Sequence, residues 1–202
     1  MRDTFFSIVG FFQQPSSRRK ELARLKKVLK ALPEPDSLPS AERKLAEDMS
    51  RLRSQILEQM GPVKSCATCA QGCPLPHGQW SGGFCCSGRT EEIFSEDELA
   101  GLKAVGVRIS DLRPPRAEHA GCAFRGPLGC SLQPGHRPAL CVIYICGDLS
   151  SELHTQGRFR EIHSLVEELK DTFSRFCTLR AKRLQEEEER QWMIELGIVT
   201  KD

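Results

Sequence analysis

The sequence predicts a mainly α-helical protein in which two N-terminal helices and a long C-terminal helix pack around a loop-rich cysteine and metal knot. Apolar residues at three- and four-residue spacing predict the helices, because that spacing places them on one helical face. Nine of the ten cysteines lie between Cys66 and Cys146, in a stretch rich in glycine and proline. The chain thus divides into an N-terminal helical segment (1–62), a cysteine-cluster metal-binding region (63–150) and a C-terminal helical segment (151–202).

The first predicted helix covers residues 16–32, with Ser17 as a plausible N-cap. Its apolar stripe consists of Leu22, Leu25, Leu29 and Leu32. The opposite face carries seven lysines and arginines against one acid, Glu21. A solvated face is the simplest explanation of this charge. Binding to nucleic acid or to an anionic membrane is the alternative, and it is not favoured.

The second predicted helix begins near Ser40 and ends at Gly61, which is followed by a proline. Its apolar stripe consists of Leu45, Met49, Leu52 and Ile56. The segment 33–39 contains three prolines and separates it from the first helix as a linker or turn. These two helices make up the N-terminal helical segment.

The cysteine region is predicted to consist mostly of loops, with one short helix inside it. Ser95 to Glu98 form a capping box, and Leu99 and Leu102 follow as the apolar residues of that helix. The run Cys141–Cys146 is open to two interpretations, a short strand or a turn that carries ligands, because it is too brief to show a period.

The long C-terminal helix is predicted to begin near Leu153. Its apolar stripe consists of Phe159, Ile162, Val166, Leu169, Phe173, Phe176 and Leu179. Cys177 follows Phe176 and is interpreted as a core residue. The glutamates 186–189 form a solvated stretch that could pair with the basic face of the first helix. The apolar residues after position 191 are expected to dock back or to contact a partner.

The concentration of cysteines has two chemical explanations, disulfides or metal. Disulfides need an oxidising compartment and hence an export signal. The apolar patch at residues 5–12 is short and no small-residue cleavage site follows it, so it is a poor signal peptide. It is also shorter than the roughly 20 apolar residues that span a bilayer. We therefore expect a cytoplasmic protein without a membrane span, whose reduced thiols bind metal.

The cysteines come in pairs that suit a metal site. The two-residue spacer between Cys66 and Cys69 lets both thiolates reach one metal from a tight turn. The side chains of two adjacent cysteines usually point apart, so Cys85 and Cys86 would serve different metals or different corners of one cluster. The other two pairs are Cys122 with Cys130 and Cys141 with Cys146. Eight thiolates fit two four-thiolate zinc sites or two iron–sulfur clusters with four thiolates each.

This pattern resembles the cysteine-cluster (CxxCxxCC) family of zinc- or iron-chelating domains. That family has C-x2-C, then C-C, then four more cysteines with an Arg-Pro before the seventh. The matching segments are CATC at 66–69, FCC at 84–86, GCAF at 121–124, GCSL at 129–132 and RPALCVIYIC at 137–146. The resemblance covers about residues 64–148 and implies that the eight paired cysteines are the ligands. It also brings in Arg137, which either donates hydrogen bonds to thiolate sulfur or backbone carbonyls, or only forms a turn.

This sequence departs from the family where fifteen residues, Cys73 among them, separate Cys69 from Cys85. Cys73 is therefore an alternative ligand. The motif C-x2-C-x3-C-P at residues 66–74 resembles the tail of a ferredoxin motif, which gives iron–sulfur a slight preference over zinc. Histidines also serve zinc, but enough thiolates are present without them. The histidines of this region are His77, His119 and His136.

The sequence contains no nucleophile–base pairing, phosphate-binding glycine loop or dinucleotide fingerprint. No catalytic residue is predicted, and an oxidoreductase is the enzyme class if there is one. The first functional prediction is a metal-binding protein that stores, delivers or senses metal. The second is an iron–sulfur protein that transfers electrons. The third is a zinc-stabilised module that binds nucleic acid or a protein partner through its helices, although the net charge of +2 favours no partner.

Overall fold

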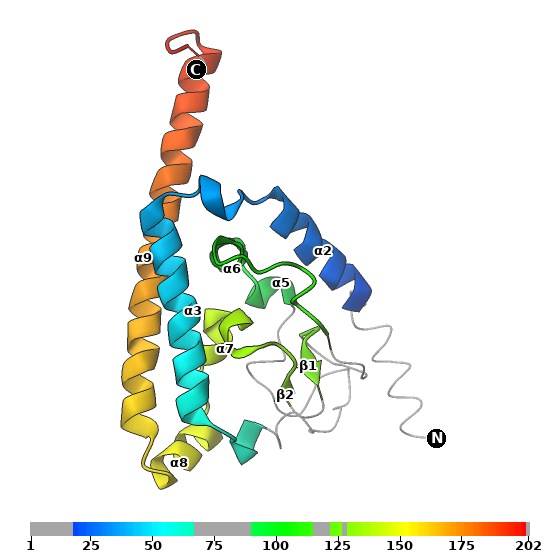
Figure 1. The fold of residues 1–202 in the computed structure, drawn as a ribbon, viewed down its shortest axis with the longest axis vertical. Coiled ribbons are helices and arrows are strands. Elements are labelled where there is room, and N and C mark those ends of the chain that lie inside the picture. The colour runs from blue at the N-terminus through cyan, green and yellow to red at the C-terminus, as the bar shows by residue number, and fades with distance from the viewer. Residues whose placement is uncertain (1–17, 67–89, 115–121, 127–128, 201–202) are drawn as a thin grey trace.

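The computed structural model describes residues 18–66, 90–114, 122–126 and 129–200, and these ranges are mainly helical (Figure 1). The helices are α2 (Arg18–Ala31), α3 (Ser40–Met60), α5 (Thr90–Ile93), α6 (Glu96–Ala104), α7 (Ala139–Ile143), α8 (Gly147–Thr155) and α9 (Phe159–Glu195). The strands are β1 (Arg125–Gly126) and β2 (Gly129–Cys130), and the 3-10 turns are η1 (Pro35–Ser37) and η3 (Pro134–His136). The predicted mainly α fold with a long C-terminal helix is confirmed.

An antiparallel pair of helices, α3 and α9, forms the long axis of the molecule (Figure 1). The predicted stripe of α3 is buried at Met49, Leu52 and Ile56. The buried positions of α9 are Ile162, Val166, Leu169, Thr172, Phe176 and Arg180. Both stripes face one hydrophobic core, which explains why helical period alone predicted these two elements.

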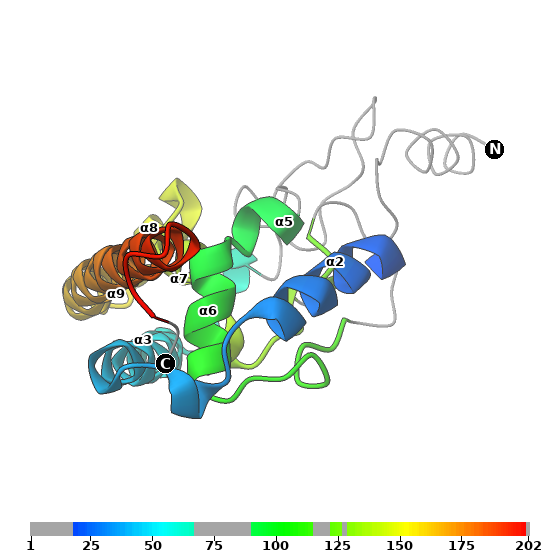
Figure 2. The ribbon, with the colours of Figure 1, turned by 90° about the horizontal axis from the view of Figure 1, so that it is seen from above.

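The short helix α6 lies between that pair and α2 (Figure 2). Its N-cap is the predicted one, because the Ser95 hydroxyl oxygen accepts a hydrogen bond from the backbone N–H of Glu98 at 3.2 Å. Leu99 and Leu102 of α6 are buried, as are three of the four leucines predicted as the stripe of the first helix. The core therefore extends from α9 and α3 through α6 to α2.

One local prediction is wrong, and one of two open interpretations is excluded. The long helix does not begin near Leu153, because Leu153 belongs to α8 and a break separates α8 from α9. Gly157 lies in that break at φ +70°, a left-handed conformation that glycine adopts without a Cβ clash. The run Cys141–Cys146 is not a strand, and its interpretation as a turn that carries ligands stays a prediction. Cys141 lies on the short helix α7, and Cys146 is the N-cap residue of α8.

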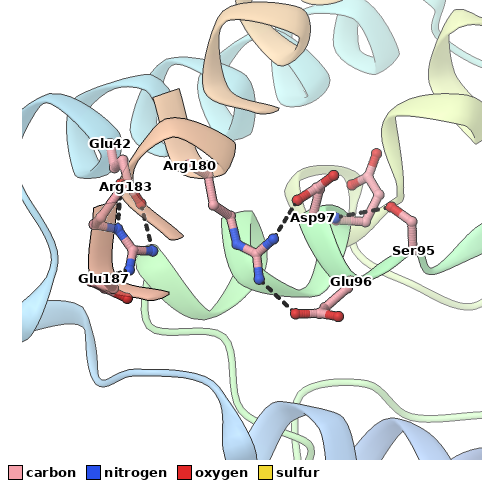
Figure 3. Close-up of polar contacts among 8 residues, drawn as sticks. Glu42, Ser95, Glu96, Asp97, Arg180, Arg183 and Glu187 are labelled. Carbon is pink, nitrogen blue, oxygen red and sulfur yellow. Dashed lines mark hydrogen bonds and ion pairs between the residues drawn. The ribbon is translucent and has the colours of Figure 1, made fainter. Parts of the chain in front are cut away.

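Two arginines of α9 fasten this helix to its neighbours (Figure 3). Arg180 reaches the first turn of α6, with Nη1 at 2.6 Å from Asp97 Oδ1 and Nη2 at 2.7 Å from Glu96 Oε1. Arg183 binds both carboxylate oxygens of Glu42 on α3, at 2.6 and 3.2 Å. Glu42 is only 1% exposed. The planar guanidinium matches a carboxylate in this two-point geometry, so the pair fixes the register of α9 against α3.

The C-terminal part of α9 extends beyond the other helices (Figure 1). Glu186 and Glu187 pair along α9 itself, with Lys182 at 3.7 Å and Arg183 at 2.8 Å. The large apolar side chains exposed in this part of α9 or directly after it are Leu184, Trp192, Leu196, Ile198 and Val199. Neither α9 nor any other helix in the described ranges has an apolar stretch long enough to cross a bilayer.

Candidate metal centre

Five of the eight predicted ligands lie in the described part of the chain. They are Cys66, Cys122, Cys130, Cys141 and Cys146, each present as a thiol rather than a disulfide. The other three, Cys69, Cys85 and Cys86, lie outside the described residues, as does the alternative ligand Cys73. The five occupy three short segments: the β1–β2 hairpin, the α7–α8 stretch, and the turn that follows α3.

The hairpin brings Cys122 back toward Cys130. Arg125 on β1 pairs with Cys130 on β2 in antiparallel register, and the Arg125 N–H donates to the carbonyl of Cys122 at 3.1 Å. A further hydrogen bond from the Ser131 N–H to the Phe124 carbonyl, at 2.9 Å, closes the hairpin. The Cys122 thiol lies within electrostatic range of Cys130. Local backbone geometry therefore places these two predicted ligands beside each other.

The pKa of the Cys122 thiol is raised to about 11 in all, and burial is the largest cause. A hydrogen bond from the Phe124 backbone N–H opposes this rise, and the neighbouring Cys130 contributes to it. A thiol with this pKa is protonated at neutral pH. Because the metal ligand is the thiolate, a metal ion must displace the Cys122 proton when it binds.

A buried threonine fixes the hairpin to the helices. Thr90 on α5 donates its hydroxyl hydrogen to a carboxylate oxygen of Glu21 on α2. The same hydroxyl oxygen accepts a hydrogen bond from the backbone N–H of Ala123 at 2.8 Å. Thr90 and Glu21 are both buried. This chain of contacts holds the backbone next to Cys122 against α2 and α5.

Arg137 of the Arg-Pro signature donates to backbone carbonyls. Its Nε lies 3.2 Å from the Leu132 carbonyl oxygen, and its Nη2 lies 3.5 Å from the carbonyl oxygen of Cys130. The sequence left open whether Arg137 donates to thiolate sulfur, donates to backbone carbonyls or only forms a turn. The structure favours donation to backbone carbonyls. The contact joins the hairpin that carries Cys130 to the segment that leads into Cys141.

A buried carboxylate holds the start of α7, the helix that carries Cys141. Glu98 Oε1 accepts the backbone N–H of Ala139 at 2.6 Å, and Glu98 Oε2 accepts from Arg53 Nη2 at 2.7 Å. Arg53 and Glu98 are 1% and 3% exposed. Cys141 also lies within electrostatic range of the Arg53 guanidinium. Three helices, α3, α6 and α7, therefore meet at one buried ion pair beside a predicted ligand.

Glu152 joins the first and the last predicted ligands. It lies on α8, which begins directly after Cys146, and it accepts the backbone N–H groups of Lys64 and Ser65 at 2.9 Å each. These two residues immediately precede Cys66. The two hydrogen bonds lower the pKa of the Glu152 carboxyl group. The turn after α3 is thus attached to the helix that follows Cys146.

The thiols are placed in neighbouring segments but are not gathered into a complete ligand set. Within residues 18–66, 90–114, 122–126 and 129–200, no group of three or more cysteine, histidine or acidic side chains is arranged to hold a metal ion. Cys177 is half-buried at the edge of the core on α9, in contact with Asp97. The donors themselves suit metals that prefer sulfur, zinc and iron–sulfur clusters among them.

Sequence reasoning missed the residues that hold these segments. Arg53 offered a signal, because an arginine lies on the apolar face of α3 beside Leu52 and Ile56. Glu98 was recognised only as part of a capping box, where its side chain would turn back to the N-cap N–H group. Its contact with Ala139 joins residues 41 positions apart, which no local pattern reveals. No pattern in the sequence pointed to a structural role of Glu152.

Comparison with protein-family models, with curated proteins and with solved structures finds no match to this chain. The resemblance to the cysteine-cluster family therefore stays a prediction that depends on the spacing of the cysteines.

Proposed function

We propose that this chain binds metal through the cysteine thiolates of residues 63–150. The proposed ligands are Cys66, Cys69, Cys85, Cys86, Cys122, Cys130, Cys141 and Cys146. One observation carries the proposal. Arg137 donates a hydrogen bond to the carbonyl of Cys130, and the carboxylates of Glu98 and Glu152 accept from backbone N–H groups that lie one or two residues before Cys141 and Cys66. Outer contacts of this kind orient ligands around a metal ion.

The preferred metal form is an iron–sulfur cluster, with zinc as the alternative. The preference depends on the ferredoxin-like spacing at residues 66–74. A cytoplasmic location accompanies the proposal, because reduced thiols are needed for either metal. With an iron–sulfur cluster the protein would store, deliver or sense metal, or transfer electrons.

The test is the metal content, the acid-labile sulfide and the visible spectrum of protein purified without oxygen. We expect bound iron with sulfide and broad visible absorption, or bound zinc in a colourless protein. The Cys130→Ser variant should lose metal, whereas the matched Cys177→Ser variant on α9 should keep the wild-type content. Wild-type protein that contains no metal would refute the proposal. Full metal content in the Cys130→Ser variant would show that Cys130 is not a ligand.

A zinc-stabilised interaction module is the second candidate, and the free end of α9 favours it. Trp192 lies near the end of α9 and is 60% exposed, and Leu196 lies directly after α9 and is 54% exposed. Exposed apolar side chains that cluster in this way commonly mark contact with another protein. Colourless protein that holds zinc tightly would favour this candidate over electron transfer.

A further inference from the structure

The C-terminal end of α9 extends away from the core (Figure 1). Arg180 is the last buried position of α9, and the helical residues that follow, 181–195, are exposed or half-buried. A helical stretch of this length that is not packed against a core is marginal in water. Its own side chains must therefore contribute to its stability.

Pairs of side chains four residues apart supply that contribution. Four of the five glutamates of this end each contact a side chain four positions earlier, an arrangement that stabilises a helix. The pairs are Lys182 with Glu186 at 3.7 Å, Arg183 with Glu187 at 2.8 Å, Gln185 with Glu189 at 2.8 Å and Gln191 with Glu195 at 3.0 Å. The fifth glutamate, Glu188, has Leu184 and Trp192 at this spacing, and neither side chain can pair with a carboxylate in this way.

Glu188 lies in the middle of an apolar surface. Leu184, Glu188, Trp192 and Leu196 recur every four residues and therefore lie along one side of the helix. Leu196 continues that side, because it has φ −79° and ψ −4° and its N–H donates to the Trp192 carbonyl at 3.0 Å. The three apolar side chains are 37%, 60% and 54% exposed. We call the surface of these four residues the α9 end face.

The turn after α9 gives the α9 end face a defined limit. Gly197 has φ +71°, a left-handed conformation that commonly ends helices. The N–H of Ile198 then donates to the carbonyl of Met193 at 3.0 Å, so the chain turns back on the last turn of the helix. Trp192 and Leu196 are thus presented on a helical surface that exists before a partner binds. A preformed surface loses less conformational entropy on binding.

The charge of this end determines which partner fits. Residues 184–200 contain five glutamates and one arginine, Arg190. The same end of a second copy would bring like charges together, and so would an anionic membrane surface. The helix α2 of a second copy has the opposite charge, but Leu25 and Leu29 of its apolar stripe are buried in its own core. The complementary partner is therefore cationic and has apolar side chains of its own to expose.

We propose that the α9 end face is a docking surface for a basic amphipathic helix of another protein. Apolar side chains of that helix pack on Leu184, Trp192 and Leu196, and a lysine or arginine among them pairs with Glu188. Tryptophan is enriched among the residues that dominate the binding energy of interfaces. The inference rests on the interaction role given to the second candidate function, names the partner for that role and requires no metal at the cysteines.

The probe for the test is a synthetic peptide labelled with fluorescein, in which leucines at helical spacing form one face and lysines occupy the other positions. Its binding to full-length protein is measured by fluorescence anisotropy at low salt. Trp192→Ala and Glu188→Lys alter the α9 end face. Glu161→Lys is the matched control, because Glu161 is exposed near the opposite end of the same helix. A second peptide keeps the leucines and has glutamate in place of each lysine.

We expect the lysine peptide to bind the wild type and the glutamate peptide not to bind. Trp192→Ala and Glu188→Lys should each weaken binding by about tenfold or more, whereas Glu161→Lys should bind as the wild type does. Circular dichroism first shows that each variant is folded. Absence of binding to the wild type, or equal affinity of wild type and Trp192→Ala, would overturn the inference. Metal-free protein that binds the peptide as described would refute the metal site and support this inference.

Two further measurements test the other occupants of the α9 end face. Analytical ultracentrifugation should show a monomer, and a dimer that Trp192→Ala abolishes would assign the surface to a second copy instead. Vesicles of phosphatidylcholine and phosphatidylserine should leave the protein in solution. Binding to these vesicles that is lost in Trp192→Ala would assign the surface to a membrane and overturn the inference.

Discussion

The helical frame and the cysteine region are stabilised in different ways. The frame, formed by α2, α3, α6 and α9, buries continuous apolar stripes and closes its ion pairs within itself. The described segments that carry cysteines between residues 122 and 146 contain strands of two residues each and a helix α7 of only five. The segments of the cysteine region are attached to the frame by a few buried apolar side chains, such as Phe124 and Val142, and by polar side chains such as Thr90 and Glu152.

The helical frame and the cysteine region therefore gain their stability from different sources. Long helices with a buried face gain their stability from apolar packing, so the frame can hold its shape from its own sequence. Short elements bury little surface and need crosslinks or metal to hold one conformation. We infer that the frame positions the cysteine segments, and that metal binding then completes them.

The largest expected effect follows metal removal. Structural thiolate sites contribute about 10–16 kcal/mol of binding free energy in small zinc domains. After treatment with a strong chelator, backbone amides of residues 122–146 should lose protection from hydrogen exchange, whereas amides of α3 and α9 should keep it. Uniform loss of protection over the whole chain would show that the two regions are not separate in stability.

The second prediction concerns a substitution that destabilises the helical frame and leaves the cysteine region unchanged. Arg183→Met leaves the buried carboxylate of Glu42 without its partner, which should lower the free energy of unfolding by about 3 kcal/mol in urea. The control is Lys182→Met, since Lys182 is exposed and pairs with Glu186 at 3.7 Å. That change should cost less than about 0.5 kcal/mol. Similar values for the two variants would contradict the role given to the pair of Arg183 and Glu42.

The third prediction concerns the joint between the two regions. Gly61 ends α3 at φ +57°, and an added Cβ would lie 3.0 Å from Nη1 of Arg158. Gly61→Ala should therefore cost about 1–2 kcal/mol, because left-handed backbone and crowding add together. Gly106→Ala is the matched control, since Gly106 has φ +80° and nothing within 4 Å of the added Cβ. A larger loss at Gly106 than at Gly61 would be inconsistent with this packing.

The smallest expected effect is a pH dependence at Glu152. Hydrogen bonds from Ser65 and Lys64 lower the pKa of this carboxyl group below its ordinary value of 4.5. A lowered pKa in the folded state means that the stabilisation is present above the unfolded pKa and is lost as pH falls through the folded pKa. The amide NMR shifts of both donors should therefore change below about pH 4.5. Glu152→Gln should abolish that change, and an unaltered titration in this variant would exclude Glu152 as its source.

The sequence predicted those parts of the fold whose signals are local. Helical period placed α2, α3 and the stripe of α9, and Ser95 marked the start of α6. The boundary between α8 and α9 was misplaced because the apolar pattern continues across it, although Gly157 was a readable sign of the break. Pattern reasoning works where one face of an element is buried over several turns.

The candidate site was less predictable. The spacing of the cysteines predicts a set of ligands, but it gives no sign that the helix at Cys141 is held by Glu98, 43 positions earlier in the chain. A five-residue helix has no period to detect, so its conformation depends on tertiary contacts. The same reason hid Arg53 and Glu152, which act through hydrogen bonds between residues distant in sequence.

X-ray absorption at the iron and zinc edges, on protein purified without oxygen, tests metal binding by thiolates most directly. The account predicts a metal whose first shell contains sulfur at about 2.3 Å, with iron neighbours in addition if a cluster is present. A first shell of nitrogen and oxygen alone, or the absence of both metals from the purified protein, would contradict it.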